Sequence, residues 1–166
     1  MEMMRTGPHK ILRKASPADV RRLVALMSAF YAEGGYPLNQ RRAAEGFTAL
    51  LADERLGQVW FIQADAQDVG HVVVTLCFSM EYGGLVAFVD DLFVKPAFRR
   101  AGLGAAALTE LRAFCAKRGV RALFVETGQE NVAAQALYRR VGFVMTNRQL
   151  LMLKLADPTH VGENSV

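Results

Sequence analysis

The stretch Leu85–Gly104, LVAFVDDLFVKPAFRRAGLG, decides the fold of this chain. Its first half is mostly apolar and indicates a buried strand, whereas Arg99 and Arg100 lie in a short connection that ends in a glycine-rich turn. Gly102 and Gly104 lack a Cβ, so the main chain can approach a ligand closely. The helix expected after them would direct its N-terminal dipole and unpaired N–H groups at that ligand. The stretch therefore predicts a phosphate-binding site.

The composition is that of one globular domain. Of 166 residues, 52% are hydrophobic and 22% are charged, and no apolar run is long enough to span a membrane. The N-terminal residues lack the apolar stretch of a secretion signal, so a cytoplasmic protein is expected. Cys77 and Cys115 lie in apolar runs without CxxC spacing and are expected to be buried free thiols. His9, His71 and His160 are dispersed and indicate neither a metal site nor a catalytic triad.

The formal net charge of +4 raises nucleic-acid binding as one possible class of function. The excess comes from scattered arginine pairs, some of which lie at helical positions that are expected to be solvated. The chain has no zinc-finger spacing, RNP-like aromatic motif or lysine-rich tail. Nucleic acid is therefore not the expected partner.

The pattern of apolar residues predicts an α+β domain with the order β-α-α-β-β-β-α-β-α-β-β, in which helices cover both faces of a mixed sheet. The domain is expected to span residues 10–155, between an N-terminal extension at 1–9 and a flexible tail at 156–166. The expected strands are His9–Lys14, Gln58–Ala64, Val69–Met80, Leu85–Val94, Val120–Glu126, Phe143–Met145 and Gln149–Leu155. The expected helices run from Pro17 to Gly34, from Asn39 to about Ala52, from Gly102 to Arg118 and from Asn131 to Arg140.

Two common phosphate-binding motifs fit the glycine-rich turn poorly. A P-loop would need a lysine after Gly104, and the chain has none there. Residues 102–107 do match the G-x-G-x-x-A pattern of dinucleotide-binding folds, and Glu126 lies 22 residues after Gly104. However, seven residues separate Val94 from Gly102, and only 40 residues follow Glu126. These spacings argue against a dinucleotide site.

The sequence Arg99–Gly104, RRAGLG, resembles the R/Q-x-x-G-x-G/A motif of the GCN5-related N-acetyltransferases. Asp90–Pro96 is similar to the central strand of that family and its exit, and Asn131–Phe143, NVAAQALYRRVGF, resembles its N-x-x-A-x-x-L/F-Y-x-x-x-G-F segment. The expected order of elements also agrees with the family fold over nearly the whole chain. Two separate motifs in the correct order make the resemblance specific. It implies an N-acetyltransferase that uses acetyl-coenzyme A.

The resemblance assigns the coenzyme to the central strand and to the turn after it. The pyrophosphate would lie on backbone N–H groups from Arg100 to Ala105, and the pantetheine arm would bond to the main chain from Leu92 to Val94. The N–H of Phe93 would polarise the thioester carbonyl. The implied cofactor-binding residues are Leu92, Phe93, Val94, Arg99, Arg100, Ala101, Gly102, Leu103, Gly104, Ala105, Asn131 and Tyr138, and no metal is implied.

The resemblance also implies direct attack of an amine on the thioester, with two proton transfers. Tyr138 matches the family tyrosine and would protonate the leaving thiolate, although a core tyrosine would have the same spacing. Asp90 is the favoured base, with Glu126 next, and strand alternation would place Asp90 and Asp91 on opposite faces. Either acid could instead pair with arginine or stabilise a bulge, and Asn131 could be a plain helix cap.

The acceptor is expected to be a cationic amine, because the candidate residues are carboxylates and aromatic rings. They are Tyr31, Glu33, Tyr36, Glu81, Asp91 and Glu126. A coenzyme A-binding module without turnover is the alternative function. Neither a membrane nor a nucleic acid is expected as a partner, whereas a homodimer is compatible with the resemblance.

Overall fold

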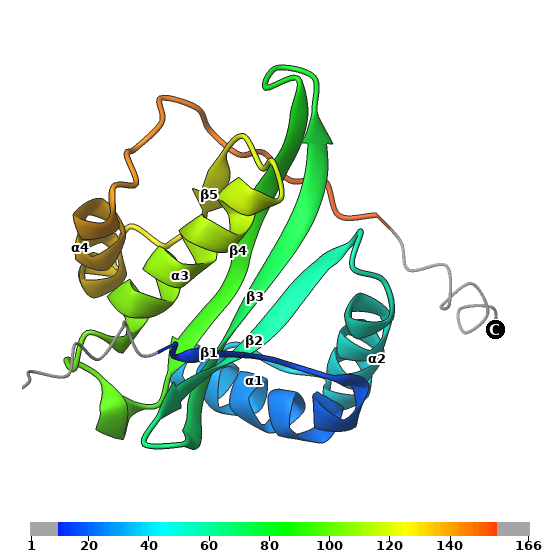
Figure 1. Ribbon diagram of the computed structural model, residues 1–166, viewed down its shortest axis with the longest axis vertical. Coiled ribbons are helices and arrows are strands. Elements are labelled where there is room, and N and C mark those ends of the chain that lie inside the picture. Colours follow the sequence, from blue (N-terminus) through cyan, green and yellow to red (C-terminus); the bar gives the residue numbers. More distant parts are fainter. Residues whose placement is uncertain (1–9, 156–166) are drawn as a thin grey trace, which may run out of the picture.

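The computed structural model describes residues 10–155, and its elements follow the predicted order as far as the fourth helix (Figure 1). One sheet contains, in spatial order, β1 (Leu12–Lys14), β2 (Gly57–Ala64), β3 (Gln67–Ser79), β4 (Gly84–Val94) and β5 (Leu123–Val125). The helices are α1 (Val20–Gly34), α2 (Gln40–Ala52), α3 (Leu103–Lys117) and α4 (Val132–Val141), with 3-10 turns η1 (Pro17–Asp19) and η2 (Pro96–Phe98). The predicted extension at 1–9 and the predicted tail at 156–166 lie outside the described residues.

Local sequence signals place the ends of the helices. Gly35 ends α1 with a left-handed φ of 70°, and Gly142 ends α4 with a φ of 103°. The Asn39 side chain caps α2 by accepting a hydrogen bond from the backbone N–H of Arg42. These residues confirm the helix limits that the sequence predicts.

The sheet is antiparallel except at its last pair. Strands β1 to β4 pair antiparallel in chain order, whereas β4 and β5 are parallel and are connected through α3. Ala87 to Val89 of β4 lie opposite Leu123 to Val125 of β5. The predicted strand–helix–strand unit is therefore confirmed, with a parallel ladder shorter than the sequence indicates.

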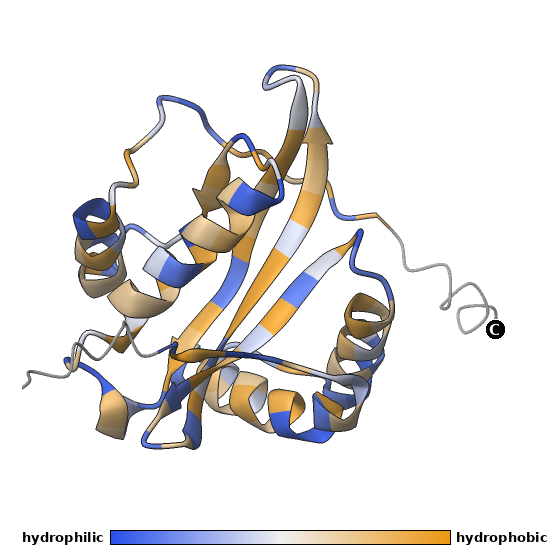
Figure 2. Ribbon diagram, viewed as in Figure 1, coloured by the Kyte–Doolittle hydropathy of each residue, from blue (hydrophilic) through white to orange (hydrophobic). Residues whose placement is uncertain are grey.

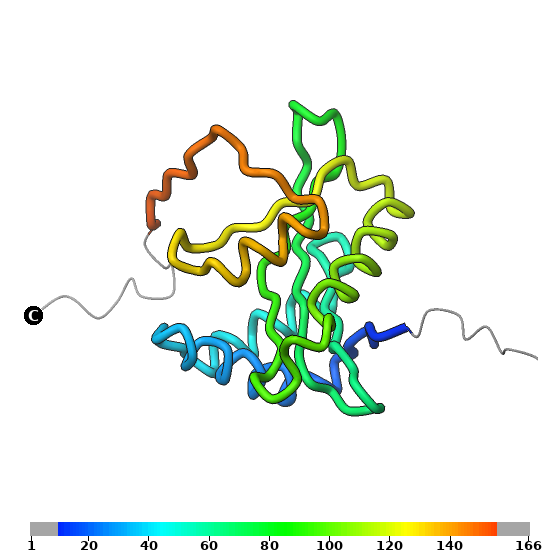
Figure 3. The backbone as a smooth tube through the Cα atoms, turned by 90° about the vertical axis from the view of Figure 1, so that its left-hand side faces the viewer, coloured from blue at the N-terminus to red at the C-terminus, as the bar shows by residue number. Residues whose placement is uncertain are grey.

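Helices cover both faces of the sheet, as predicted. Side chains of α1 and α2 pack on one face, and those of α3 pack on the other with α4 beside it. Figure 3 shows α3 on the side of the strands opposite α1 and α2. Because both faces of the central strands are buried, β3 and β4 are largely apolar along most of their length (Figure 2).

The β3–β4 hairpin extends past both helical layers (Figure 1). Cys77 and Phe78 lie in this projecting part and are exposed. The predicted burial of Cys77 is therefore wrong, whereas Cys115 on the inner face of α3 is buried as predicted. An apolar run does not distinguish these two cases, because burial depends on what lies over the strand.

The two closing strands predicted at Phe143–Met145 and Gln149–Leu155 are wrong. The structure describes these residues without strand pairing, and Val144 and Met145 are exposed together with Leu150, Leu151, Met152, Leu153 and Leu155. The segment runs from α4 as an extended loop, orange in Figures 1 and 3. An apolar pattern becomes a strand only where a neighbouring strand offers its backbone groups, and β5 pairs with β4 alone among the described strands.

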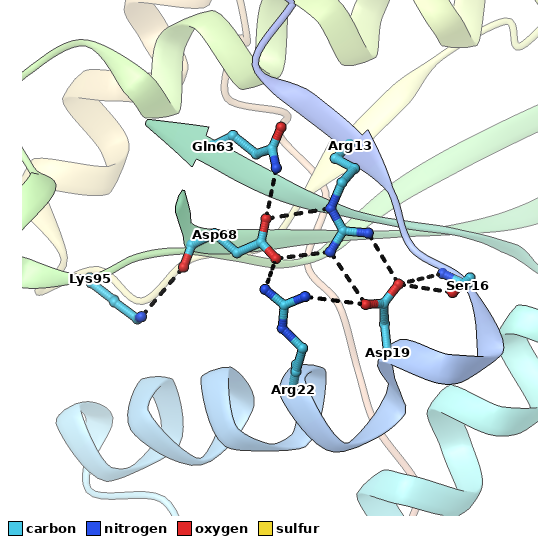
Figure 4. A network of polar contacts seen from close by, with 7 residues as sticks. All are labelled: Arg13, Ser16, Asp19, Arg22, Gln63, Asp68 and Lys95. Carbon is cyan, nitrogen blue, oxygen red and sulfur yellow. Dashed lines mark hydrogen bonds and ion pairs between the residues drawn. The ribbon is translucent and has the colours of Figure 1, made fainter. Parts of the chain in front are cut away.

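Ion pairs join β1 and α1 to the beginning of β3 (Figure 4). The Arg13 guanidinium lies 2.8 Å from a carboxylate oxygen of Asp68 and 3.2 Å from one of Asp19. Arg22 of α1 contacts the same two carboxylates, and Gln63 donates a further hydrogen bond to Asp68. This network (Arg13, Asp19, Arg22, Gln63 and Asp68) fixes the edge of the sheet against α1.

Within residues 10–155, no helix is both long enough and apolar enough to cross a membrane.

Candidate active site

The centre of the candidate site is the part of β4 that has lost its parallel neighbour. β5 pairs with β4 only as far as Val89, so Asp91 to Val94 pair with β3 alone among the described strands. A strand edge of this kind presents backbone groups that an extended ligand can use. The edge contains Leu92, Phe93 and Val94, the residues that the family resemblance assigns to a pantetheine arm.

A β-bulge lies at the point where the parallel pairing ends. Val73 of β3 is opposite Asp91 and Val74 is opposite Val89, so Asp90 is an extra residue in β4. A bulge interrupts the alternation of side chains between the two faces. Asp90 and Asp91 both raise the pKa of Tyr31 on α1, after the larger effect of burial. Strand alternation therefore no longer assigns Asp90 and Asp91 to opposite faces, because the bulge interrupts it.

Three carboxylates gather at this point. Val125 is opposite Val89, so Glu126 follows the end of β5 beside the bulge that contains Asp90. The pKa of Asp90 is raised, first by burial and then by the charges of Asp91 and Glu126. A group of acids with one raised pKa can both attract a cationic amine and accept its proton.

His71 contacts the candidate site through Asp91, and the sequence analysis did not predict this contact. It lies on β3 and is fully buried, and its Nε2 is 3.4 Å from Oδ2 of Asp91. The available signal was a single histidine inside the apolar run of β3. That signal is weak, because the pairing with Asp91 depends on the β3–β4 register and on the bulge.

The turn between β4 and α3 has the geometry of an anion site. Arg100 has a φ of 66° and Gly102 a φ of 79°, so the chain turns sharply before α3. No side chain caps α3, and its first turn contains no acidic residue. The N–H groups of Leu103, Gly104 and Ala105 have no acceptor among the described residues, because the first helical hydrogen bond runs from Ala106 to Gly102. An anion would satisfy them and interact favourably with the helix dipole.

Gly104 also serves the packing of α3 against α4. A Cβ at this position would lie 3.1 Å from Cδ2 of Leu137, whereas a Cβ at Gly102 would meet nothing within 4 Å. Gly102 is therefore needed for its backbone conformation and Gly104 for close approach of the helix that contains Tyr138.

Arg99 and Glu33, predicted to bind the donor and the acceptor respectively, are paired with each other. The guanidinium Nη1 and Nη2 donate to the Glu33 carboxylate at 2.6 and 2.7 Å, and Nε donates to the Val94 carbonyl at 2.7 Å. The guanidinium also lies 5.6 Å from the centre of the Phe93 ring. The end of α1 thus reaches the turn before α3.

The aromatic candidates on the acceptor side lie on and after α1. The Tyr31 ring contacts Phe30 at 5.6 Å and Tyr36 at 6.3 Å between centroids. Tyr31 is half-buried and close enough to Asp91 and Asp90 for their charges to raise its pKa, whereas Tyr36 is 65% exposed. Tyr31 is therefore the aromatic residue that the structure brings to the site.

Tyr138 is half-buried on α4, and its ring lies 5.6 Å from that of Phe143. Burial raises the pKa of the Tyr138 hydroxyl, so it remains protonated at neutral pH. Asn131 begins this helix as a cap, because its Oδ1 accepts a hydrogen bond from the Ala134 N–H at 3.1 Å. The structure thus gives Asn131 the capping role that the sequence left open beside ligand binding.

Glu81 lies apart from the other candidates. It belongs to the exposed β3–β4 turn, where Arg148 donates to its carboxylate at 2.6 and 2.8 Å. Asp90 lies six positions after Gly84 in β4, a distance of about 20 Å along a strand. The structure therefore does not bring Glu81 to the bulge.

Comparison with known proteins agrees with this geometry. A family model described as "Acetyltransferase (GNAT) family" matches residues 22–143. The aminoglycoside N(6')-acetyltransferase type 1 of Stenotrophomonas maltophilia is 28% identical over 151 residues, which are 89% of this chain and 95% of that protein.

Solved structures share the fold. An integron cassette protein from the mobile metagenome of Cole Harbour Salt Marsh has a TM-score of 0.83 and 45% identity, over 95% of this chain and 98% of its own. A predicted acetyltransferase from Clostridium acetobutylicum, solved with acetyl-CoA, has a TM-score of 0.73 and 17% identity, over 86% of this chain and 94% of its own.

Proposed function

Because this chain belongs to the acetyltransferase (GNAT) family, we propose that it transfers the acetyl group of acetyl-coenzyme A to a primary amine of a small, cationic acceptor. The observation behind this proposal is the meeting of two features at one place. The unpaired edge of β4 from Asp90 to Val94 is followed, after the connection 95–102, by the uncapped N-terminus of α3. An elongated ligand with a phosphate group at one end and a hydrogen-bonding arm at the other suits both.

The donor is bound along this path. Backbone N–H groups of Leu103, Gly104 and Ala105 would take the pyrophosphate, and the arm would extend along Leu92 to Val94. The N–H of Phe93 would hold the thioester oxygen, where negative charge develops when the amine attacks. This use of backbone groups explains why the turn tolerates a left-handed, non-glycine residue at Arg100.

In the reaction, the neutral amine attacks the thioester carbon, and a C–N bond forms. The tetrahedral intermediate collapses as the C–S bond breaks, and the sulfur leaves with the electron pair. Tyr138 donates the proton that the thiolate takes up, and its buried hydroxyl retains that proton at neutral pH. Asp90, directly or through water, accepts the proton that the ammonium group loses.

The acceptor is expected to have more than one positive charge. Asp90, Asp91 and Glu126 lie around the end of the parallel ladder, and one amine can neutralise only part of this charge. Tyr31 borders the same place and offers a ring face to a cation. The similarity to an aminoglycoside acetyltransferase supports the same class of acceptor.

An amine panel tests the proposal. Purified protein is first titrated with acetyl-coenzyme A in a calorimeter, and release of free thiol is then followed with aminoglycosides, polyamines, amino acids and lysine peptides. Binding of the donor and turnover with polycationic small molecules are expected. If acetyl-coenzyme A does not bind, the proposal is wrong, and binding without turnover on any amine would favour a coenzyme-binding module.

A further inference from the structure

His71 is a polar ring in apolar surroundings. It is 0% exposed, and its ring centre lies 6.4, 6.5 and 6.1 Å from those of Phe30, Phe47 and Phe93. Removing an imidazole from water is costly unless it forms a hydrogen bond. Its contact with Asp91 is therefore the feature that makes this position tolerable for a histidine.

The geometry favours one tautomer of His71. Nε2 faces Oδ2 of Asp91 at 3.4 Å, whereas Nδ1 is buried with no hydrogen-bond partner among the described residues. With the proton on Nε2, the ring donates to the carboxylate and leaves only an acceptor unpaired. With the proton on Nδ1, a donor would be buried unpaired and the Nε2 lone pair would face a carboxylate oxygen.

Asp91 connects this buried ring to the site. Its Oδ2 faces His71, whereas Oδ1 has no hydrogen bond within the described residues and is not among the fully buried unpaired atoms. Asp91 follows the bulge residue Asp90, and both act on Tyr31. One oxygen is thus held from inside the core, and the other has no partner among the described residues.

We propose that His71 is a positioning residue, which donates from Nε2 to Asp91 and orients Oδ1 of that carboxylate to bind the ammonium group of the acceptor. The inference rests on the proposed function, because it names the group that holds the acceptor. It makes His71 part of acceptor recognition and not only of the core. Asp90 remains the base, so the two neighbouring acids have different tasks.

Two substitutions of His71 separate positioning from core packing. His71→Leu fills similar space without a donor, whereas His71→Gln places an amide N–H near the position of Nε2. We expect His71→Leu to raise the KM for the acceptor about tenfold, the scale of a lost charged hydrogen bond. The Kd for acetyl-coenzyme A should stay unchanged, and His71→Gln should recover most of the acceptor KM.

A double-mutant cycle identifies Asp91 as the residue through which His71 acts. In an Asp91→Asn background, His71→Leu should raise the acceptor KM no further. A wild-type KM in His71→Leu would overturn the proposal, and so would additive effects of the two changes. A lower Tm in both His71 variants with an equal KM in both would also overturn it, because that result describes packing alone.

Nitrogen-15 NMR of the imidazole provides a test that needs no activity. The wild-type protein should show the Nε2–H tautomer of His71, and the Nδ1–H tautomer would overturn this inference whatever the enzyme does. Absence of turnover on any amine would instead refute the proposed function. The two proposals can therefore fail separately.

Discussion

Glu33 and Arg99 are 66 residues apart in the sequence and form a two-contact ion pair between the end of α1 and the turn before α3. Arg99 belongs to the motif expected to bind the coenzyme, and Glu33 belongs to the segment expected to border the acceptor. The pair holds these two sides of the site together. It also gives the guanidinium a carboxylate partner in the place where a phosphate would bind.

Substitution of Glu33 tests this competition. Arg99 lowers the pKa of Glu33 through their hydrogen bonds, so the carboxylate is charged at neutral pH. Glu33→Gln should tighten acetyl-coenzyme A binding about threefold, in keeping with a solvent-accessible ion pair worth less than about 1 kcal/mol. Calorimetry measures the change, with Glu45→Gln on the exposed face of α2 as the control. Weaker binding in Glu33→Gln would mean that the pair shapes the site.

Tyr138→Phe should lower kcat by about 100-fold, the usual scale for loss of a general acid. Affinity for acetyl-coenzyme A should remain, because the phenyl ring still packs on Phe143. The matched control is Tyr82→Phe, which removes a hydroxyl from the distant β3–β4 turn. Stopped-flow or steady-state thiol release measures the effect, and an unchanged kcat would exclude Tyr138 as the acid.

The pH profile of kcat/KM should report on Asp90. Burial, Asp91 and Glu126 raise the pKa of Asp90 above 3.8, so the acid limb of the profile should lie above that pH. The base works only when unprotonated, and activity should therefore fall as the pH drops through this raised pKa. Glu126→Gln removes one of the raising charges and should move the limb to lower pH.

Asp90→Asn should abolish the acid limb and lower kcat/KM about 100-fold. Glu130→Gln, an exposed acid in the loop before α4, should leave the profile unchanged. If the limb persists in Asp90→Asn, the base is another group, and Glu126 is the next candidate.

Stability should fall in acid because of Asp19. Hydrogen bonding to Arg13 is the largest cause that lowers the pKa of Asp19 from 3.8 to about 2. A lowered folded-state pKa stabilises the protein above the unfolded value, and the gain is lost as the pH falls from about 4 to about 2. Urea unfolding should show that the free energy of unfolding falls by about 1–2 kcal/mol over this pH range. The Asp19→Asn variant should not show this fall. Asp53→Asn is the control, because Asp53 has a similarly lowered pKa but its partner Arg55 is exposed, so solvent should screen that pair. If Asp19→Asn lost as much stability at low pH as the wild type, the loss could not be assigned to Asp19.

The part of the site that local rules govern could be predicted from the sequence. Several features depend only on residues that are close together in the chain. They are the apolar run of β4, the glycine turn, the start of α3 and the Asn131 cap. Their prediction required only the apolar pattern of strands, the conformational freedom of glycine and the residue preferences at helix ends.

The remainder depends on contacts between distant segments. The bulge at Asp90 exists in the register between β3 and β4, and it interrupts the alternation that would separate Asp90 from Asp91. His71 acquires its role only through that register. The prediction of two closing strands was wrong for a related reason. Their apolar pattern is present, but among the described residues no neighbouring strand pairs with them. The type of a residue favours a local conformation, whereas the bulge, the contact of His71 and the extent of the sheet depend on which segments pair.

The exposed segment after α4 bears on how the protein behaves in concentrated solution. Residues 149–155, QLLMLKL, have Lys154 as their one charge, and their apolar side chains are mostly exposed. Short, extended, weakly charged sequences of this kind are the sites at which chains stack into intermolecular sheets, and a lysine inside them opposes such stacking. Solubility is therefore expected to depend on the charge of Lys154, so that acetylation of this one amine would make the protein more prone to aggregate.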